Sequence, residues 1–243
     1  MSADQIAAQI QSTKALPVSP SWLNAVLGLS GQTQRNIPTA ALTKTALFRV
    51  LASDFRESLT TNSSSRLPID IYDPTVQERR LAGPIPVQVL DIEDIGTSLW
   101  SQVEAIERVE RGEAIRGREI VRTVAVGEDQ EAQENSSANN NGNSAAPNAS
   151  GHSGYGPHRL ILQDAVGTKA VAIEMQRVEG ISLEKLAIGA KFVLRDAPVA
   201  RGMILLKPAS VDLLGGKIEA LDNPWKEGRK ARLLERITAM QTD

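Results

Sequence analysis

Five short runs rich in valine and isoleucine, most of them separated by turn residues, constrain the fold of this chain more than any other feature. Side chains branched at Cβ favour the extended backbone of a strand. Between the third and fourth runs, Ser182 to Leu186 is predicted to form a short helix that ends at Gly189. Three strands, a helix and two more strands is the order of an OB-fold barrel. The five runs are Val87 to Val89, Leu160 to Leu162, Val171 to Met175, Phe192 to Leu194, and Ile204 to Leu206.

The first of these strands is predicted to contain a bulge. Val87 and Val89 share one phase of the alternation along a strand, whereas Leu90 and Ile92 share the other. One extra residue in a strand shifts the phase in this way and bends the strand. The bend favours a small barrel, although the alternation alone leaves a sandwich open.

The segment before the strands, residues 1–66, is predicted to be a helical bundle. Ser19 followed by Pro20 is typical of a helix start, and Gly28 is typical of a helix end. A second helix is predicted to begin at Thr39, with apolar residues at helical spacing as far as Leu59. The fold class is therefore α+β, with an N-terminal helical bundle followed by a five-stranded OB-fold domain over residues 67–243.

A long insertion, residues 97–157, follows the first barrel strand. It contains an amphipathic helical pattern near Leu99 and a run from Ile120 to Val126 that favours an extra strand. Residues 135–157 carry no charged side chain and almost no apolar one. Such a segment buries too little apolar surface to offset its ordering entropy, so it is predicted to be disordered. After Gly215, residues 216–240 are predicted to form a C-terminal helix.

The composition argues against most kinds of catalysis. The chain has no cysteine and only two histidines, His152 and His158, which lie in or beside the polar tract. A histidine that acts as a base or a metal ligand must be held rigidly, and a solvated position is the plainer interpretation for both. We therefore expect no enzyme activity, no metal and no cofactor. The net charge is −2 and the apolar runs are short, which predicts a soluble intracellular protein.

Two further groups of residues are candidate sites. Asp91, Glu93 and Asp94 form the densest carboxylate cluster, but alternation in a strand predicts a solvated outer face for the first two. An OB-fold that binds single-stranded nucleic acid stacks bases on exposed aromatic side chains. The five runs contain one aromatic residue, Phe192, whose position suits the core at least as well. The barrel is therefore predicted to bind protein.

Several segments taken in order resemble the RecQ-mediated genome instability protein 1 family. The most specific is ARGMILLKPASVDLLGGKIEAL, with a strand, a Lys-Pro turn and a Gly-Gly helix entry. The resemblance covers nearly the whole chain outside the polar tract. Its segments are Leu16 to Gly28, Val50 to Leu59, Pro84 to Gly96, His158 to Met175, and Leu186 to Leu221.

The resemblance implies a non-catalytic nuclear subunit that docks on type IA topoisomerase III in a complex with a RecQ-family helicase. That complex dissolves double Holliday junctions without crossover and protects genome stability. In the family, the insertion after the first barrel strand reaches the topoisomerase gate, and here the insertion begins near Ser98, Leu99 and Trp100. The long polar tract departs from the family pattern. Longer members carry a second, C-terminal OB-fold that binds another small subunit, and we do not expect that partner here.

The predicted partner-binding residues lie mainly on the insertion. An apolar face there packs either on the chain's own barrel or on a partner, and the resemblance favours the partner. The predicted set is Ser98, Leu99, Trp100, Val103, Ile106, Lys191 and Arg201. A basic C-terminal stretch is the only credible patch for weak binding to single-stranded or junction DNA, through Lys226, Arg229, Lys230 and Arg232. A stand-alone single-strand DNA-binding protein is the alternative function.

Overall fold

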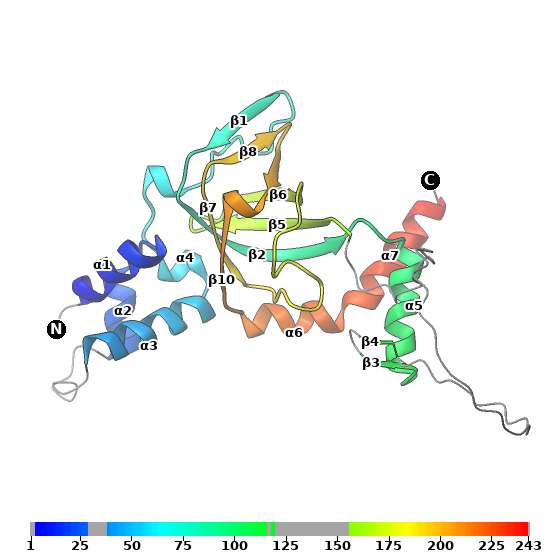
Figure 1. Ribbon diagram of the computed structural model, residues 1–243, viewed down its shortest axis with the longest axis horizontal. Coiled ribbons are helices and arrows are strands. Elements are labelled where there is room, and N and C mark those ends of the chain that lie inside the picture. Colours follow the sequence, from blue (N-terminus) through cyan, green and yellow to red (C-terminus); the bar gives the residue numbers. More distant parts are fainter. Residues whose placement is uncertain (1–2, 29–37, 116–117, 120–155, 243) are drawn as a thin grey trace, which may run out of the picture.

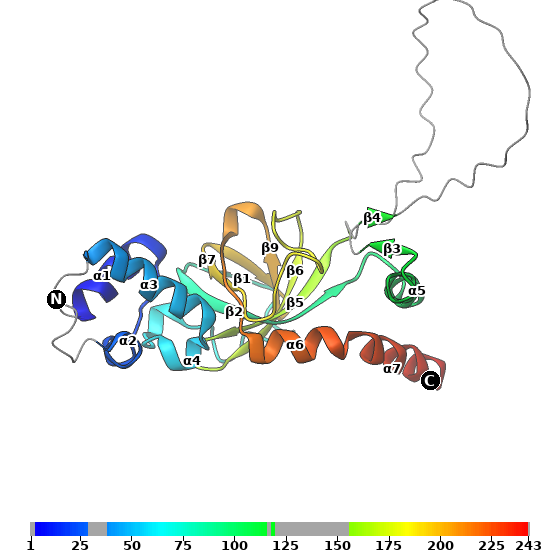
Figure 2. The same cartoon turned by 90° about the horizontal axis from the view of Figure 1, so that it is seen from below.

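The computed structural model describes residues 3–28, 38–115, 118–119 and 156–242, and its elements form three groups along the longest axis of the molecule (Figure 1). Helices α1 to α4 lie at one end, a curled β-sheet lies in the middle, and α5 and α7 lie together at the other end (Figures 1 and 2). The predicted α+β class and the OB-fold are confirmed.

The N-terminal helices enclose a core of their own. The predicted start of α2 at Ser19 is confirmed, because the Ser19 side chain accepts a hydrogen bond from Trp22 N, and Gly28 ends the helix with a φ of 59°. The single helix predicted from Thr39 to Leu59 is interrupted at Ser53, after which Asp54 caps a short new helix. The helices are α1 (Ala3–Lys14), α2 (Pro20–Leu27), α3 (Thr39–Ala52) and α4 (Phe55–Ser58).

The sheet has eight strands in the order β1-β8-β9-β6-β5-β2-β7-β10. The five predicted runs lie in strands β2, β5, β6, β7 and β9, except that Met175 lies one residue beyond β6. The strands are β1 (Glu78–Leu81), β2 (Ile85–Asp94), β5 (His158–Asp164), β6 (Lys169–Glu174), β7 (Lys191–Leu194), β8 (Ala197–Ala200), β9 (Met203–Leu206) and β10 (Val211–Gly215). A short hairpin, β3 (Ala114–Ile115) with β4 (Arg118–Glu119), lies apart from this sheet.

The sheet curls because β7 and β8, which follow one another in the chain, pair with strands on different sides of the barrel. β7 pairs with β2, and β8, which begins after Arg195 and Asp196, pairs with β9. β9 also runs parallel to β6. The chain of β7 and β8 thereby links the two sides of the barrel, and β1 and β10 extend it at the edges. Buried apolar side chains from all of these strands fill the interior.

The bulge predicted in the first barrel strand is confirmed. The register of β2 against β5 shifts between Val89 and Asp91, so Val89 and Ile92 both point into the core. The predicted helix from Ser182 to Leu186 is wrong, because these residues form only turns. Leu186 N donates to Ser182 O, as in one turn of a helix. The helix does not continue, because Leu186 and Ile188 are buried in the barrel core.

The C-terminal helix predicted over 216–240 is two helices, α6 (Glu219–Glu227) and α7 (Arg229–Thr242). Gly228 ends α6 with its N–H donating to Pro224 O, and glycine has little helix propensity. The two helices follow one side of the barrel, below β2 in Figure 2. The run from Ile120 to Val126 lies outside the described residues, as do residues 135–155 of the polar tract. Pro157 at its end is described, and its carbonyl accepts a hydrogen bond from Ile95 N at 3.0 Å.

Candidate partner-binding site

The first part of the insertion forms α5 (Leu99–Glu110), as the amphipathic pattern predicts. Ser98 is its N-cap, and the Ser98 hydroxyl accepts a hydrogen bond from Ser101 N at 3.1 Å. Gln102 anchors the first turn to the barrel, because its Nε2 donates to Asp94 O at 3.0 Å. The end of β2 therefore fixes where α5 begins.

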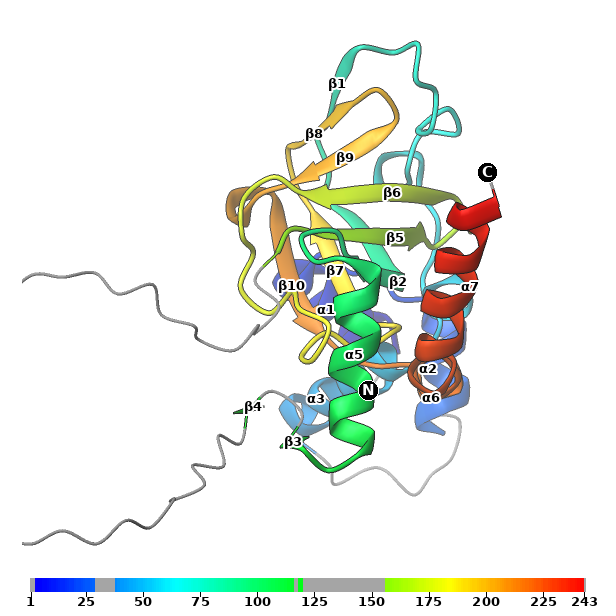
Figure 3. The ribbon, with the colours of Figure 1, turned by 90° about the vertical axis from the view of Figure 1, so that its right-hand side faces the viewer.

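The apolar face of α5 packs on the C-terminal helix of the same chain. Val103 is 3% exposed and lies in a small core with Leu233 and Ile237 of α7, and Leu99 and Ile106 border this core. Figure 3 shows α5 and α7 side by side. From the sequence, this face could pack either on the barrel or on a partner protein. The structure supplies a third surface, α7, which buries Val103 and partly covers Leu99 and Ile106, three of the residues predicted to bind a partner.

Trp100 differs from these three residues because 59% of its surface is exposed. It lies in the first turn of α5, one residue from Leu99, and so on a different side of the helix. A large aromatic residue that contributes little to its own core, on a helix fixed at both ends by other contacts, has the properties of an interface anchor. Of the predicted apolar set on α5, Trp100 is the residue most available to another molecule.

Basic side chains near the C-terminus form ion pairs with carboxylates of the same chain. Lys230 Nζ lies 2.7 Å from Glu110 Oε2 and 3.2 Å from Glu107 Oε1. Arg236 Nη1 lies 2.7 Å from Glu93 Oε1 on β2. These ion pairs hold α7 against α5 and the barrel, which reduces the charge available for a phosphate.

The other three predicted phosphate-binding residues also have internal partners. Lys226 Nζ lies 2.6 Å from the carboxylate of Asp222, which is buried. Arg232 donates to Trp225 O at 2.7 Å and its guanidinium lies 5.5 Å from the centre of the Trp225 ring. Arg229 contacts Gln102 Oε1 at 3.4 Å.

The sequence predicted a solvated outer face for Asp91 and Glu93. In the structure the carboxylates of β2 instead have hydrogen-bond or ion-pair partners within the chain. Asp91 Oδ1 accepts a hydrogen bond from Trp225 Nε1 at 2.6 Å. Asp94 is 5% exposed, and its carboxylate accepts bonds from Gly96 N at 2.7 Å and from Thr97 Oγ1 at 2.8 Å. Asp94 thus shapes the turn that follows β2, whereas Asp91 and Glu93 pair with residues of the C-terminal helices, far along the sequence.

Lys191, predicted at the rim of the barrel, is fully buried where the helical bundle meets β7. Its Nζ donates to Ser53 O at 2.6 Å and to Gln88 Oε1 at 2.8 Å. It also lies 4.5 Å from the centre of the Phe55 ring. The predicted surface role of Lys191 is therefore corrected: it joins the helical bundle to the barrel. No local pattern signals this burial, because Ser53 and Gln88 are distant from Lys191 along the chain.

Gln88 is the centre of this buried interface. Its Oε1 accepts a hydrogen bond from Phe55 N at 3.0 Å, while its Nε2 donates to Asp54 Oδ1 at 2.9 Å and to Gln163 Oε1 at 3.1 Å. Burial raises the pKa of Asp54, but hydrogen bonds from Arg56 and Gln88 outweigh it and leave that pKa below its ordinary value. Asp54 is therefore ionised at neutral pH.

We expect the stability of the protein to increase with pH above neutrality because of Lys191. Burial lowers the pKa of Lys191 from 10.5 to about 7, so the unfolded chain binds one more proton than the folded chain between these values. Unfolding free energy should rise through this window, with a slope of at most about 1.4 kcal/mol per pH unit. Denaturant unfolding at several pH values measures this. Lys191→Met removes the titrating group, and an equal pH dependence in that variant would contradict the assignment.

Arg201, the remaining predicted residue, lies on the turn between β8 and β9 and not beside α5 (Figure 1). It adopts a left-handed backbone with a φ of 46°, and its N–H donates to Val76 O at 3.2 Å. Its guanidinium reaches Pro74 O at 3.4 Å and is otherwise exposed. The structure thus separates Arg201, Lys191 and the α5 residues into three places.

His158, predicted to be solvated, is 2% exposed. Its Nδ1 lies 2.5 Å from Glu174 Oε2, and the same carboxylate accepts bonds from His158 N and from Val178 N. This pair joins the start of β5 to the end of β6. His152 lies outside the described residues. Within the described ranges, no group of three or more His, Cys, Asp or Glu residues is placed to hold a metal ion.

Comparisons with known proteins agree with this architecture. Residues 62–229 match a family model described as RMI1, N-terminal OB-fold domain, and residues 10–58 match one described as RMI1, N-terminal helical domain. The chain belongs to the RMI1 family. The family resemblance predicted from the sequence is therefore confirmed.

A curated relative in the RMI1 family is RecQ-mediated genome instability protein 1 of Schizosaccharomyces pombe. It is 27% identical over 188 residues, an alignment that covers 77% of this chain and 76% of the yeast protein. In the part of this RMI1-family chain that the structure describes, no helix is long and apolar enough to span a membrane.

Proposed function

We propose that this chain acts in genome stability as a non-catalytic subunit that binds type IA topoisomerase III in a nuclear complex with a RecQ-family helicase. In this complex it promotes the dissolution of double Holliday junctions and adjusts the topoisomerase gate through the insertion that begins at Ser98. Membership of the RMI1 family and the printed name of the yeast relative support the link to RecQ and to genome stability.

The observation that carries the topoisomerase contact is the exposure of Trp100 on a helix that is otherwise packed and ion-paired within the chain. Val103 and Lys230 fix α5 against α7, and Gln102 fixes it to β2. A rigid helix loses little conformational entropy when its exposed aromatic residue enters a partner pocket. Trp100 is therefore the central residue of the proposed contact, and Ser98, the N-cap of the same helix, lies two residues before it.

Co-purification with topoisomerase III, followed by a dissolution assay, tests the proposal. The chain and the topoisomerase should elute together in size-exclusion chromatography, and adding the chain to topoisomerase and RecQ-family helicase should increase the non-crossover product. Separate elution at micromolar concentrations of both proteins would argue against the proposal. Cleavage of DNA strands by the chain alone would contradict the proposal that the chain is non-catalytic.

The alternative, a stand-alone single-strand DNA-binding protein, has less support. Phe192 is completely buried, so the one aromatic residue of the five predicted runs provides no stacking surface. The predicted phosphate-binding lysines and arginines have partners within the chain.

We expect direct DNA binding by the chain alone to be weak and salt-dependent. A dissociation constant in the range of about 1–100 μM near physiological salt is typical of contacts that are only electrostatic. Fluorescence anisotropy with a labelled single strand, at several salt concentrations, measures it. Replacing Lys226, Arg229, Lys230 and Arg232 by glutamate should abolish the binding. Because these residues also hold the C-terminal helices in place, a thermal melt must show that the variant is folded. Nanomolar binding at physiological salt would favour the alternative function.

A further inference from the structure

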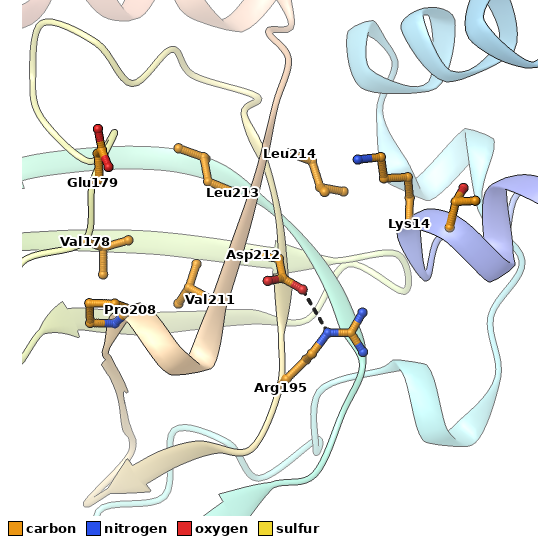
Figure 4. A pocket seen from close by; sticks show the side chains of 10 residues that line it. Lys14, Val178, Glu179, Arg195, Pro208, Val211, Asp212, Leu213 and Leu214 are labelled. Carbon is orange, nitrogen blue, oxygen red and sulfur yellow. Dashed lines mark hydrogen bonds and ion pairs between the residues drawn. The ribbon is translucent and has the colours of Figure 1, made fainter.

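The outer edge of β10 borders a pocket with a volume of about 430 Å³ (Figure 4). β10 is the last strand of the eight-stranded sheet, and among the described residues no strand pairs with its other side. The edge lies between the end of α1, which contributes Thr13 and Lys14, and the segment after β6, which contributes Val178 and Glu179.

The pairing of β10 with β7 shows which backbone groups face this pocket. Arg195 N donates to Ser210 O, and Asp212 lies opposite Val193, two residues further along the ladder. In an antiparallel ladder, pairs that exchange hydrogen bonds alternate with pairs whose N–H and C=O groups point away from each other. Val211 and Leu213 therefore direct their N–H and C=O groups away from β7, into the pocket.

The two faces of β10 differ in chemistry, and Figure 4 shows them on opposite sides of the strand. Val211 and Leu213 lie on the barrel side with Val178, and they belong to or border the barrel core. Asp212 and Leu214 lie on the side of the helical bundle. There Arg195 Nε lies 2.8 Å from Asp212 Oδ2, and Lys14 lies near Leu214 in Figure 4.

We propose that the β10 edge binds an extended peptide segment of a partner protein by adding it to the sheet as a further strand. Backbone groups of the peptide pair with the free groups of Val211 and Leu213, since an extended chain is the one ligand that satisfies this spacing of donors and acceptors. The bulge at Leu214 interrupts the register and ends the stretch that can pair. The site thus takes a short segment.

Side chains of the added strand alternate between the two faces, which defines the preferred sequence. Apolar residues pack beside Val178 and Leu213 on the barrel side. On the other side lie two cations and one carboxylate: Arg195 pairs with Asp212, and Lys14 lies beside Leu214 (Figure 4). Acidic residues of the peptide therefore fit at the two ends, near Lys14 and near Arg195, with an uncharged residue opposite Asp212. The pattern is acidic, apolar, polar, apolar, acidic.

Nuclear magnetic resonance of the full chain labelled with nitrogen-15 tests the proposal, with acetyl-Glu-Val-Thr-Val-Glu-amide as the probe. Saturable binding should shift the amide signals of Val211 and Leu213 and slow their hydrogen exchange. The amide of Asp212, already bonded to β7, should exchange at an unchanged rate. Acetyl-Lys-Val-Thr-Val-Lys-amide should bind about tenfold more weakly.

Two charge variants complete the experiment. Lys14→Glu should weaken binding of the glutamate peptide by about tenfold, and Lys44→Glu, on α3 and outside the pocket, has the same net charge and should bind it as the unmodified protein does. No saturable shift at millimolar peptide would overturn the proposal. Shifts that leave the amides of Val211 and Leu213 unaffected would overturn it as well, and so would an affinity insensitive to Lys14→Glu.

Discussion

Trp100→Ala is expected to weaken binding to topoisomerase III by more than about thirtyfold, which corresponds to at least about 2 kcal/mol. The side chain is 59% exposed, so its removal leaves the core formed by Val103, Leu233 and Ile237 intact. The melting temperature should therefore change by less than about 2 °C. Isothermal titration calorimetry and a thermal melt on the same purified variant measure both quantities.

Phe48→Ala is the matched control for this experiment. Phe48 is an aromatic residue with 69% of its surface exposed, but it lies on α3 in the helical bundle, at the opposite end of the molecule from α5 (Figure 1). Its replacement should leave the affinity for topoisomerase III unchanged. Equal losses from Phe48→Ala and Trp100→Ala would show that the interface is not centred on α5. Unchanged affinity and unchanged strand passage with the Trp100 variant would refute the proposed role of the insertion.

Asp164→Ala is expected to lower the unfolding free energy by at least about 3 kcal/mol, through loss of acceptors for buried backbone donors. Asp164 is fully buried at the end of β5. Its Oδ1 accepts bonds from the N–H groups of Val166, Gly167 and Thr168 at 3.0, 2.9 and 2.8 Å. Its Oδ2 accepts one from Leu67 N at 2.8 Å, which ties the start of the barrel domain to the β5–β6 turn.

The corresponding fall in melting temperature is roughly 10 °C for a protein of this size. Asp70→Ala is the control, because the Asp70 side chain is 60% exposed and pairs only at the surface with Arg79. It should cost less than about 1 kcal/mol. A similar melting temperature for the Asp164 variant and the unmodified protein would mean that water replaces the carboxylate at these four donors.

The strands and helix caps were predictable because their signals are local. Val87 and Val89 alternate correctly before the bulge, and Ser19 caps α2 with an atom three residues from its donor. The edge strand β1 was missed, since its Glu-Arg-Arg sequence has low strand propensity and it forms only by pairing with β8. The predicted helix from Ser182 failed for the opposite reason, because local helix signals are outweighed there by burial of Leu186 and Ile188.

The candidate site was predictable only in part, because its contacts connect distant segments. The amphipathic pattern of α5 showed that an apolar face exists, but α7, which covers it, lies more than a hundred residues further along the chain. Lys191 resembles any surface lysine in the sequence, and its burial depends on Ser53 and Gln88. Pairwise contacts of this kind leave no periodicity in a single sequence.

The pairing of β2 with β5 also has a consequence for folding kinetics. Asp94 lies directly opposite His158, so the two central strands can meet only after a loop of about 60 residues has closed. That closure costs about 2 kcal/mol more in chain entropy than a four-residue hairpin. β5 and β6 are joined by the short turn around Asp164, and we expect this hairpin to form early and to act as the template. β2, which carries the contacts to both the helical bundle and α5, should then add late, so that the two ends of the molecule become connected in the slowest step of folding.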